Sequence, residues 1–286
     1  RMLLTLSAQC LSARLLPKKG RSSASAGGGG GGGAGSLSLT DLPRYARDEL
    51  GLFGLNLTTS LLAGADLRKL EMIREAADKA SCPCLVLIES EPQPMATLDE
   101  AKGATGVERM TRVVQAASRL GCNSVAMKIV NDDHADAFDY AAERIREVLK
   151  KADKMDVNVL IAPHDGLTND PDRLTELVKK VGGFRIGTLP DFQTASRAPD
   201  PLMYLRRLMP YAQAVTASAL NFTPGKKKSE FVHESYNLEE FAKTVASVGY
   251  TGTLALEYRG DGEPEEGLRL MRQVLESALG LEVAES

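Results

Sequence analysis

The sequence predicts an α/β protein with a single-domain (β/α)8 barrel fold. Short apolar runs alternate with helical stretches from one end of the chain to the other, and eight such pairs can be recognised. The runs are rich in aliphatic and β-branched residues, as parallel strands covered by helices must be. The 286 residues suit an α/β barrel, which typically needs about 250. A doubly wound open sheet is the alternative, but neither G-x-G-x-x-G nor a P-loop follows the first run, which weakens a nucleotide-binding form of that fold.

The eight expected strands are apolar runs that end in polar or turn-forming residues. In chain order they are 3–10 (LLTLSAQC), 52–57 (LFGLNL), 84–88 (CLVLI), 124–130 (SVAMKIV), 157–162 (VNVLIA), 184–189 (FRIGTL), 212–217 (AQAVTA) and 252–257 (GTLALE). Each run is too short for a helix of ordinary length and is followed by a helical stretch, so strands are the better interpretation.

The helical stretches between these runs carry start and stop signals. Asp170 precedes Pro171 and suits a helix N-cap, and Asn237 precedes LEEFAKTV in the same way. Gly121 and Gly249 suit helix C-terminal positions. The expected helices are 42–49, 66–80, 106–120, 133–154, 172–181, 201–209, 238–248 and 264–279.

One segment differs from the rest in composition. Residues 18–35 read KKGRSSASAGGGGGGGAG, with seven consecutive glycines. Such a tract has nothing to bury and a high backbone entropy, so we expect a disordered Gly/Ser-rich loop insertion after the first strand. The rest of the 1–286 chain forms one barrel domain in this interpretation.

Composition restricts the function classes. The net charge of −3, from 35 basic and 38 acidic residues, gives no attraction to nucleic acid or to an anionic membrane surface. No run approaches the roughly 18 apolar residues of a membrane span. The four cysteines show no C-x-x-C spacing and are expected to be buried or half-buried free thiols rather than metal or redox groups. Free thiols are typical of a reducing compartment, so we expect a cytoplasmic location. Export through an N-terminal signal within residues 2–26 is the lesser alternative.

In a barrel of this kind the chemistry lies where the strands end. The polar residues that meet this condition are Glu89, Lys128, His164, Asp165, Asp191, Thr216, Ser218, Asn221, Glu257 and Arg259. Of these, we expect Glu257 and His164 as candidate catalytic groups and Asp191 with Glu257 as metal ligands. Lys128, Glu89, Asn221 and Arg259 are the expected substrate-binding residues.

Carboxylates that converge from different strands repel one another and need a cation. Glu89, Asp191 and Glu257 are therefore a candidate oxygen-ligand set for Mg²⁺ or Mn²⁺, and Lys128 is the alternative neutralising group. Simpler interpretations stand beside these. Glu89 also fits a helix cap or a surface ion pair, and His164 fits a hydrogen-bonded structural residue. The remaining two histidines, His134 and His233, are expected to be exposed.

Several segments resemble the xylose-isomerase-like barrels, and specifically the sugar phosphate isomerase/epimerase group. They are LTDLPRYARDELGLFGLNL at 39–57, DVNVLIAPHDGLTNDPDRLTELV at 156–178, GTLPDF at 187–192, DPLMYLRRLMPYAQAV at 200–215 and YTGTLALEYRGDGEPEEG at 250–267. The resemblance implies a divalent metal (Mn, Mg or Co) held by Glu, Asp, His and Glu at the ends of strands five to eight. It also implies proton transfer between neighbouring carbons of an open-chain sugar.

The chain departs from that pattern at two of the four ligand positions. Asp191 and Glu257 match the acids of strands six and eight, and His164 matches a histidine that commonly follows the strand-five glutamate. The strand-five glutamate itself falls at Ala162, and the strand-seven histidine falls at Thr216. A divalent cation is then expected to be weakly bound or absent.

Three functions remain open at this point. The first is an isomerase or epimerase that acts on a small sugar or polyol with metal assistance. The second is a barrel that has lost catalysis and binds a small polar ligand or a partner. The third, an apurinic-endonuclease-like enzyme, needs many metal ligands and a basic face, whereas this chain has three histidines and a net charge of −3.

Overall fold

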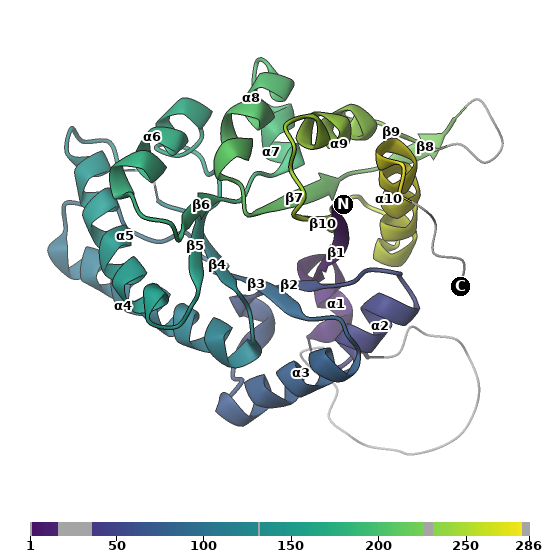
Figure 1. Ribbon diagram of the computed structural model, residues 1–286, viewed down its shortest axis with the longest axis horizontal. Coiled ribbons are helices and arrows are strands. Elements are labelled where there is room, and N and C mark those ends of the chain that lie inside the picture. The colour runs from purple at the N-terminus through teal and green to yellow at the C-terminus, as the bar shows by residue number, and fades with distance from the viewer. Residues whose placement is uncertain (1, 17–35, 131, 226–230, 282–286) are drawn as a thin grey trace.

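The structure, a computed structural model, contains a curled eight-stranded parallel sheet that closes on itself (Figure 1). It describes residues 2–16, 36–130, 132–225 and 231–281. The strands follow the order β6-β5-β4-β3-β2-β1-β10-β7, and single parallel bridges from Thr188 to Ala212 and from Asp191 to Thr216 join the two ends. The barrel strands are β1 (Leu3–Ser7), β2 (Leu55–Thr58), β3 (Cys84–Ile88), β4 (Ser124–Met127), β5 (Asn158–Ile161), β6 (Ile186–Thr188), β7 (Ala214–Ala219) and β10 (Thr253–Tyr258). The (β/α)8 prediction is confirmed.

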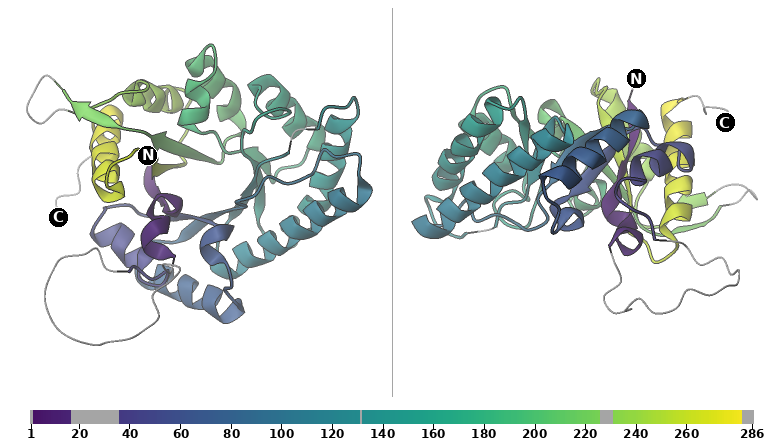
Figure 2. Two further views of the ribbon diagram at one scale, coloured as in Figure 1. Left: turned by 180° about the vertical axis from the view of Figure 1, so that it is seen from behind. Right: turned by 90° about the horizontal axis from the view of Figure 1, so that it is seen from below.

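Helices surround the strands on the outside of the ring, as the two views in Figure 2 also show. They are α1 (Ser12–Leu15), α2 (Leu42–Asp48), α3 (Leu67–Lys79), α4 (Glu100–Leu120), α5 (Ala137–Asp153), α6 (Pro171–Val181), α7 (Phe192–Ser196), α8 (Pro201–Leu208), α9 (Leu238–Ser247) and α10 (Pro264–Leu279). Three 3₁₀ turns, η1 (Ala8–Leu11), η2 (Thr59–Leu62) and η3 (Met209–Tyr211), and a hairpin of β8 (Phe222–Pro224) with β9 (Phe231–His233) complete the described elements.

Alternation along each strand divides the core into two parts. Outward-facing side chains such as Leu256 pack against the helices in one large apolar cluster. Inward-facing side chains include a smaller cluster of mostly aliphatic residues that fills part of the barrel interior, among them Ala162 and Leu189. Because strand side chains alternate with a period of two, Glu257 faces the interior beside the outward-facing Leu256 and Tyr258.

The expected helix signals act as caps. The Asp170 side chain accepts the backbone N–H groups of residues 172 and 173, and the Asn237 side chain accepts that of residue 240. Gly121 ends α4 with a φ of 78°, a left-handed conformation that favours glycine. These local signals therefore set the helix boundaries as the sequence predicts.

Element boundaries differ from expectation in several places. The expected first strand, 3–10, ends at Ser7 and continues as a 3₁₀ turn. Helix α4 begins at Glu100 instead of residue 106, and α5 begins at Ala137 instead of residue 133. Helices α1 and α7 and the β8–β9 hairpin were not expected. The expected loop insertion at 18–35 lies outside the described residues.

No helix in the described part of the chain is long and apolar enough to cross a membrane. The four cysteines are free thiols, as predicted, with Cys10 half-buried and the other three buried. Burial raises the pKa of Cys82 to about 12, so this thiol stays protonated and unreactive at neutral pH.

Candidate functional site

Six of the ten polar residues predicted at the strand ends line one cavity of about 530 Å³ at the C-terminal mouth of the barrel: Glu89, Lys128, Asp191, Thr216, Glu257 and Arg259. His164, Asp165, Ser218 and Asn221 are not part of this lining. We refer to this cavity as the mouth cavity. It is lined by Gln9, Thr58, Ser60, Ile88, Glu89, Ser90, Glu91, Lys128, Ala162, Pro163, Leu189, Asp191, Thr194, Thr216, Glu257 and Arg259. Hydroxyl groups and charges dominate this lining, and none of these side chains is aromatic.

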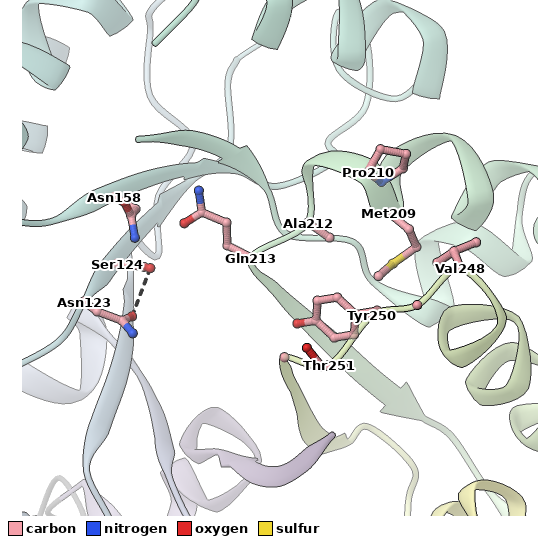
Figure 3. Close-up of a pocket in the computed structure, with 12 residues that line it drawn as sticks. Asn123, Ser124, Asn158, Met209, Pro210, Ala212, Gln213, Val248, Tyr250 and Thr251 are labelled. Carbon is pink, nitrogen blue, oxygen red and sulfur yellow. Dashed lines mark hydrogen bonds between the residues drawn. The ribbon is translucent and has the colours of Figure 1, made fainter. Parts of the chain in front are cut away.

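A second cavity of about 640 Å³ lies at the opposite, N-terminal end of the strands (Figure 3). Its lining is amide- and hydroxyl-bearing, with Asn123, Asn158 and Gln213 around it. The phenol of Tyr250 is the titratable side chain in this lining, and burial raises its pKa to about 12. With no carboxylate, imidazole, thiol or ammonium in its lining, this cavity offers no acid–base chemistry at neutral pH. The mouth cavity is the candidate site because it collects charged side chains from the C-terminal ends of several strands, where barrels of this kind place their chemistry.

Asp191 lies where β6 meets α7 and is 14% exposed at its side chain. It caps α7, because its Oδ1 accepts the backbone N–H of Thr194 at 2.8 Å. The same oxygen accepts the hydroxyl of Ser218 on β7 at 3.2 Å. Asp191 is therefore held rigidly at the seam where the barrel closes.

Glu257 lies in β10, beside the neighbouring strand β1, and its side chain lines the mouth cavity. Its Oε2 accepts the hydroxyl of Ser7 at 2.5 Å, and its side chain is 14% exposed. Ser7 is the last residue of β1, so this contact joins the first and last strands of the barrel.

The guanidinium of Arg259 lies between these two carboxylates. Its Nη2 donates to Asp191 Oδ2 at 2.7 Å and its Nη1 to Asp191 Oδ1 at 3.2 Å, while its Nε donates to Glu257 Oε1 at 2.7 Å. Gln193 accepts a further bond from Nη1 at 2.8 Å. Burial alone would lower the pKa of Arg259, but the two carboxylates raise it above its usual value, so the guanidinium stays charged.

Glu89, a predicted substrate-binding residue, lines the mouth cavity with a side chain only 2% exposed. Its Oε2 accepts from Arg109 Nε at 2.7 Å, and its Oε1 accepts from the Thr59 hydroxyl and the Glu91 backbone N–H, each at 3.1 Å. The carboxylate is thus occupied by protein donors and ties the end of β3 to α4.

Lys128 lines the mouth cavity and is exposed, and among the described residues its ammonium makes no hydrogen bond or ion pair. His164 is half-buried and lies close enough for electrostatic interaction with Lys128. Burial and the Lys128 charge lower the pKa of His164, while Asp165 acts in the opposite direction. His164 is therefore neutral at pH 7, the form that accepts a proton. Its side chain is not part of the cavity lining.

Two predicted placements differ from the structure. Asn221 lies outside the cavity lining, where it bonds Asp261 and Tyr258 and fixes the loop after β10. The expectation that both remaining histidines are exposed is wrong. His134 is half-buried with its Nε2 at 2.7 Å from the Ala96 carbonyl, and His233 is 7% exposed because it packs inside the β8–β9 hairpin.

Ala162 and Thr216 lie in the mouth cavity with Asp191 and Glu257, at the four positions that the resemblance assigns to a divalent metal. The donors present do not fit such an ion. Ala162 offers no ligand atom, Thr216 offers a neutral hydroxyl, and both carboxylates already accept from Arg259. Within the described residues, no group of three or more His, Cys, Asp or Glu side chains is placed to hold a metal.

Sequence reasoning missed the partners that hold these carboxylates. The contact of Ser7 with Glu257 joins the two ends of the chain and follows only from the closed ring, whereas Arg109 reaches Glu89 from α4, the helix that follows β3. Arg259 was expected to bind substrate rather than to bridge two acids. Its spacing of two residues from Glu257 was an available signal, because side chains two apart on an extended strand face the same side.

The comparisons with known proteins concern the family and the fold of the chain. The family model described as xylose isomerase-like TIM barrel matches residues 49–278. No curated protein matches the chain. Among solved structures, 3-keto-D-glucoside 4-epimerase from E. coli is 12% identical, with 97% of this chain and 100% of that chain covered and a TM-score of 0.70.

Two further structures show the same fold. D-psicose 3-epimerase from Clostridium cellulolyticum H10, solved with D-tagatose, is 14% identical, covers 84% of this chain and 92% of its own, and has a TM-score of 0.63. A xylose isomerase-like TIM barrel protein from Mycobacterium smegmatis in complex with magnesium is 19% identical, covers 84% and 89%, and has a TM-score of 0.62. The family match spans most of the sequence, and the chain therefore belongs to the xylose isomerase-like TIM barrel family.

Proposed function

We propose that the chain binds a small polyol or keto-sugar in the mouth cavity. The observation that carries this proposal is the lining of the cavity, in which hydroxyl, amide, carboxylate, ammonium and guanidinium groups outnumber the apolar side chains of Ile88, Ala162, Pro163 and Leu189. A volume of about 530 Å³ lies within the roughly 300–1,000 Å³ of small-molecule sites. A polyol presents many hydroxyl groups that both donate and accept, and this lining offers both kinds of partner. Structural neighbours with the same fold are sugar epimerases.

Titration with D-fructose, D-tagatose and sorbitol in the presence of EDTA, followed by calorimetry or ligand-observed NMR, tests the proposal. Lys128 is the best residue to change, because its ammonium has no described protein partner and its loss leaves no orphaned group. K128A should weaken binding about tenfold, equivalent to about 1.4 kcal/mol, since a hydrogen bond to a charged group is worth about that much.

The matched control is K154A. Lys154 is also exposed and follows the C-terminal end of α5, on the face of the barrel opposite the mouth. It should leave the sugar affinity unchanged. Saturable binding that K128A and K154A affect equally would place the ligand elsewhere and refute the assignment to the mouth cavity.

Isomerisation or epimerisation of such a sugar is the second candidate function. It is favoured by the family match and by the carboxylates of Asp191 and Glu257 in the mouth cavity. The test is interconversion of ketohexoses in D₂O, run with EDTA and separately with added Mn²⁺, with deuterium incorporation at carbon as the readout. Deuterium incorporation that is lost in E257Q would establish this activity, and its absence under both conditions would refute it.

A further inference from the structure

Both carboxylates in the mouth cavity are fully engaged by protein donors. Asp191 Oδ1 accepts from Thr194, Ser218 and Arg259, and its Oδ2 accepts from Arg259. Glu257 accepts from Arg259 at Oε1 and from Ser7 at Oε2. Each of the four oxygens that could ligate a cation therefore already has a hydrogen-bond donor at 3.2 Å or closer. An incoming ion would have to displace these donors.

Electrostatics requires a cation between these two acids. They come from β6 and β10 and are each only 14% exposed, so water screens their mutual repulsion incompletely. A guanidinium is suited to this place because it is planar, permanently charged and able to bond one carboxylate through two nitrogens. Arg259 does so with Asp191 and uses its third nitrogen for Glu257.

The changes at the other two ligand positions agree with this arrangement. A divalent ion needs several ligand atoms around it, and Ala162 and Thr216 remove a carboxylate and an imidazole from the set. A guanidinium needs no further ligands, because its charge is spread over nitrogens that already have acceptors. A mouth organised by Arg259 can therefore accept an alanine and a threonine where a metal site cannot.

We propose that Arg259 replaces the divalent cation of the mouth cavity, so that Asp191 and Glu257 are organised by a side chain of this chain instead of by a metal. This replacement concerns the positive charge that holds the two acids, and it does not depend on which sugar or polyol the cavity binds. Four of the five N–H groups of Arg259 are directed at Asp191, Glu257 and Gln193. One Nη2–H has no acceptor among the described residues and remains for an oxygen of a bound molecule.

Titration of the protein with Mn²⁺, followed by the electron paramagnetic resonance signal of free Mn²⁺ and by thermal shift, tests the inference. The wild-type protein should neither reduce the free Mn²⁺ signal nor gain thermal stability from Mn²⁺. R259Q removes the charge and frees carboxylate oxygens, and should raise the Mn²⁺ affinity at least about tenfold. R259K keeps a cation near the same acids and should show a smaller gain than R259Q.

Arg185 provides the matched control. It also bonds two aspartates, Asp153 and Asp156, but those partners are exposed on the opposite end of the barrel. R185Q removes an arginine from between two acids without touching the mouth, and should not create Mn²⁺ affinity. An equal gain in R185Q and R259Q would show a non-specific charge effect and overturn the inference.

Restoration of the missing ligands gives a second, independent measurement. A162E combined with T216H should bind Mn²⁺ at least about tenfold more tightly when R259Q is also present, because the guanidinium no longer occupies the carboxylates. Equal Mn²⁺ affinity with and without R259Q would refute the replacement.

The wild-type titration decides the question even if R259Q does not fold. Stoichiometric Mn²⁺ binding that D191N abolishes would overturn the inference. The sugar titration in EDTA tests the proposed ligand, independently of the Mn²⁺ titration, which tests the replacement of the metal by Arg259. Failure of sugar binding together with absence of Mn²⁺ binding refutes the proposed ligand and leaves the replacement intact.

Discussion

The ion pair of Glu89 and Arg109 should respond unequally to the loss of either partner. The Glu89 side chain is 2% exposed, whereas that of Arg109 is 42% exposed. In R109M the carboxylate stays buried and keeps only the neutral donors at Thr59 and Glu91. In E89Q the guanidinium of Arg109 can turn into water, and the amide retains the shape of the carboxylate. We therefore expect R109M to be the more destabilising change.

The magnitudes follow from burial. Removal of one partner from a fully buried pair costs about 3–5 kcal/mol, and the lower end applies here because water reaches Arg109. R109M should thus lower the free energy of unfolding by about 3 kcal/mol. E89Q loses a charge-assisted bond but leaves no buried charge, so about 1 kcal/mol is expected.

Urea unfolding followed by circular dichroism measures both values. R112M is the matched control, since Arg112 lies on the same helix and pairs with Glu108 while both side chains are more than half exposed. That change should cost at most about 0.5 kcal/mol. If E89Q proves as costly as R109M, or costlier, then burial of the carboxylate does not govern the pair, and the assignment of Glu89 as a structural residue is refuted.

Three further predictions concern the rest of the fold. Burial lowers the pKa of His233, whose Nε2 accepts the Leu220 backbone N–H at 2.8 Å, so the folded state binds a proton less readily than the unfolded chain. The contribution of His233 to stability should be constant above about pH 6.5 and fall as the pH drops below that value. In pH-dependent urea unfolding H233N should make this fall smaller and leave the part that comes from His164, whose pKa is also lowered; an unchanged pH dependence in H233N would contradict the prediction. G103A would place a Cβ against the guanidinium of Arg144, which is held by bonds to the Met95 and Thr97 carbonyls, and should cost about 1–3 kcal/mol in the same assay; a neutral result would contradict this packing. Cys82, with its pKa raised to about 12 by burial, should react with a thiol reagent only in urea, and rapid labelling of the folded protein would contradict the burial of its thiol.

The sequence was sufficient to predict the barrel and to bring together part of the residues at its mouth. Parallel strands deliver the residues at their C-terminal ends to one place, so Ala162, Asp191, Thr216 and Glu257 could be grouped although they are far apart in the chain. Local caps such as Asp170 were equally readable, because a cap depends on only a few neighbouring residues.

Features that depend on side-chain packing in three dimensions could not be predicted in the same way. The start of α4 was hidden because Gly103 resembles a loop residue, whereas the structure needs glycine there to admit the guanidinium of Arg144. His233 follows a run of charged residues and looked exposed, but the hairpin turns it against Phe222 and Tyr236. Neither contact leaves a periodic pattern in the sequence.

The position of Arg259 could be predicted from the sequence, but its role as a bridge between two acids could not. The strand period of two directs Glu257 into the mouth cavity, and it directs Arg259, two residues later, to the same side. A barrel with an alanine and a threonine at two ligand positions still has to neutralise Asp191 and Glu257, and an arginine at this spacing does so without any added ligand. The residues at positions 162, 216 and 259 are therefore best explained together. Ala162 and Thr216 remove ligand atoms for a metal, and the fixed positive charge of Arg259 neutralises the two acids in place of that metal.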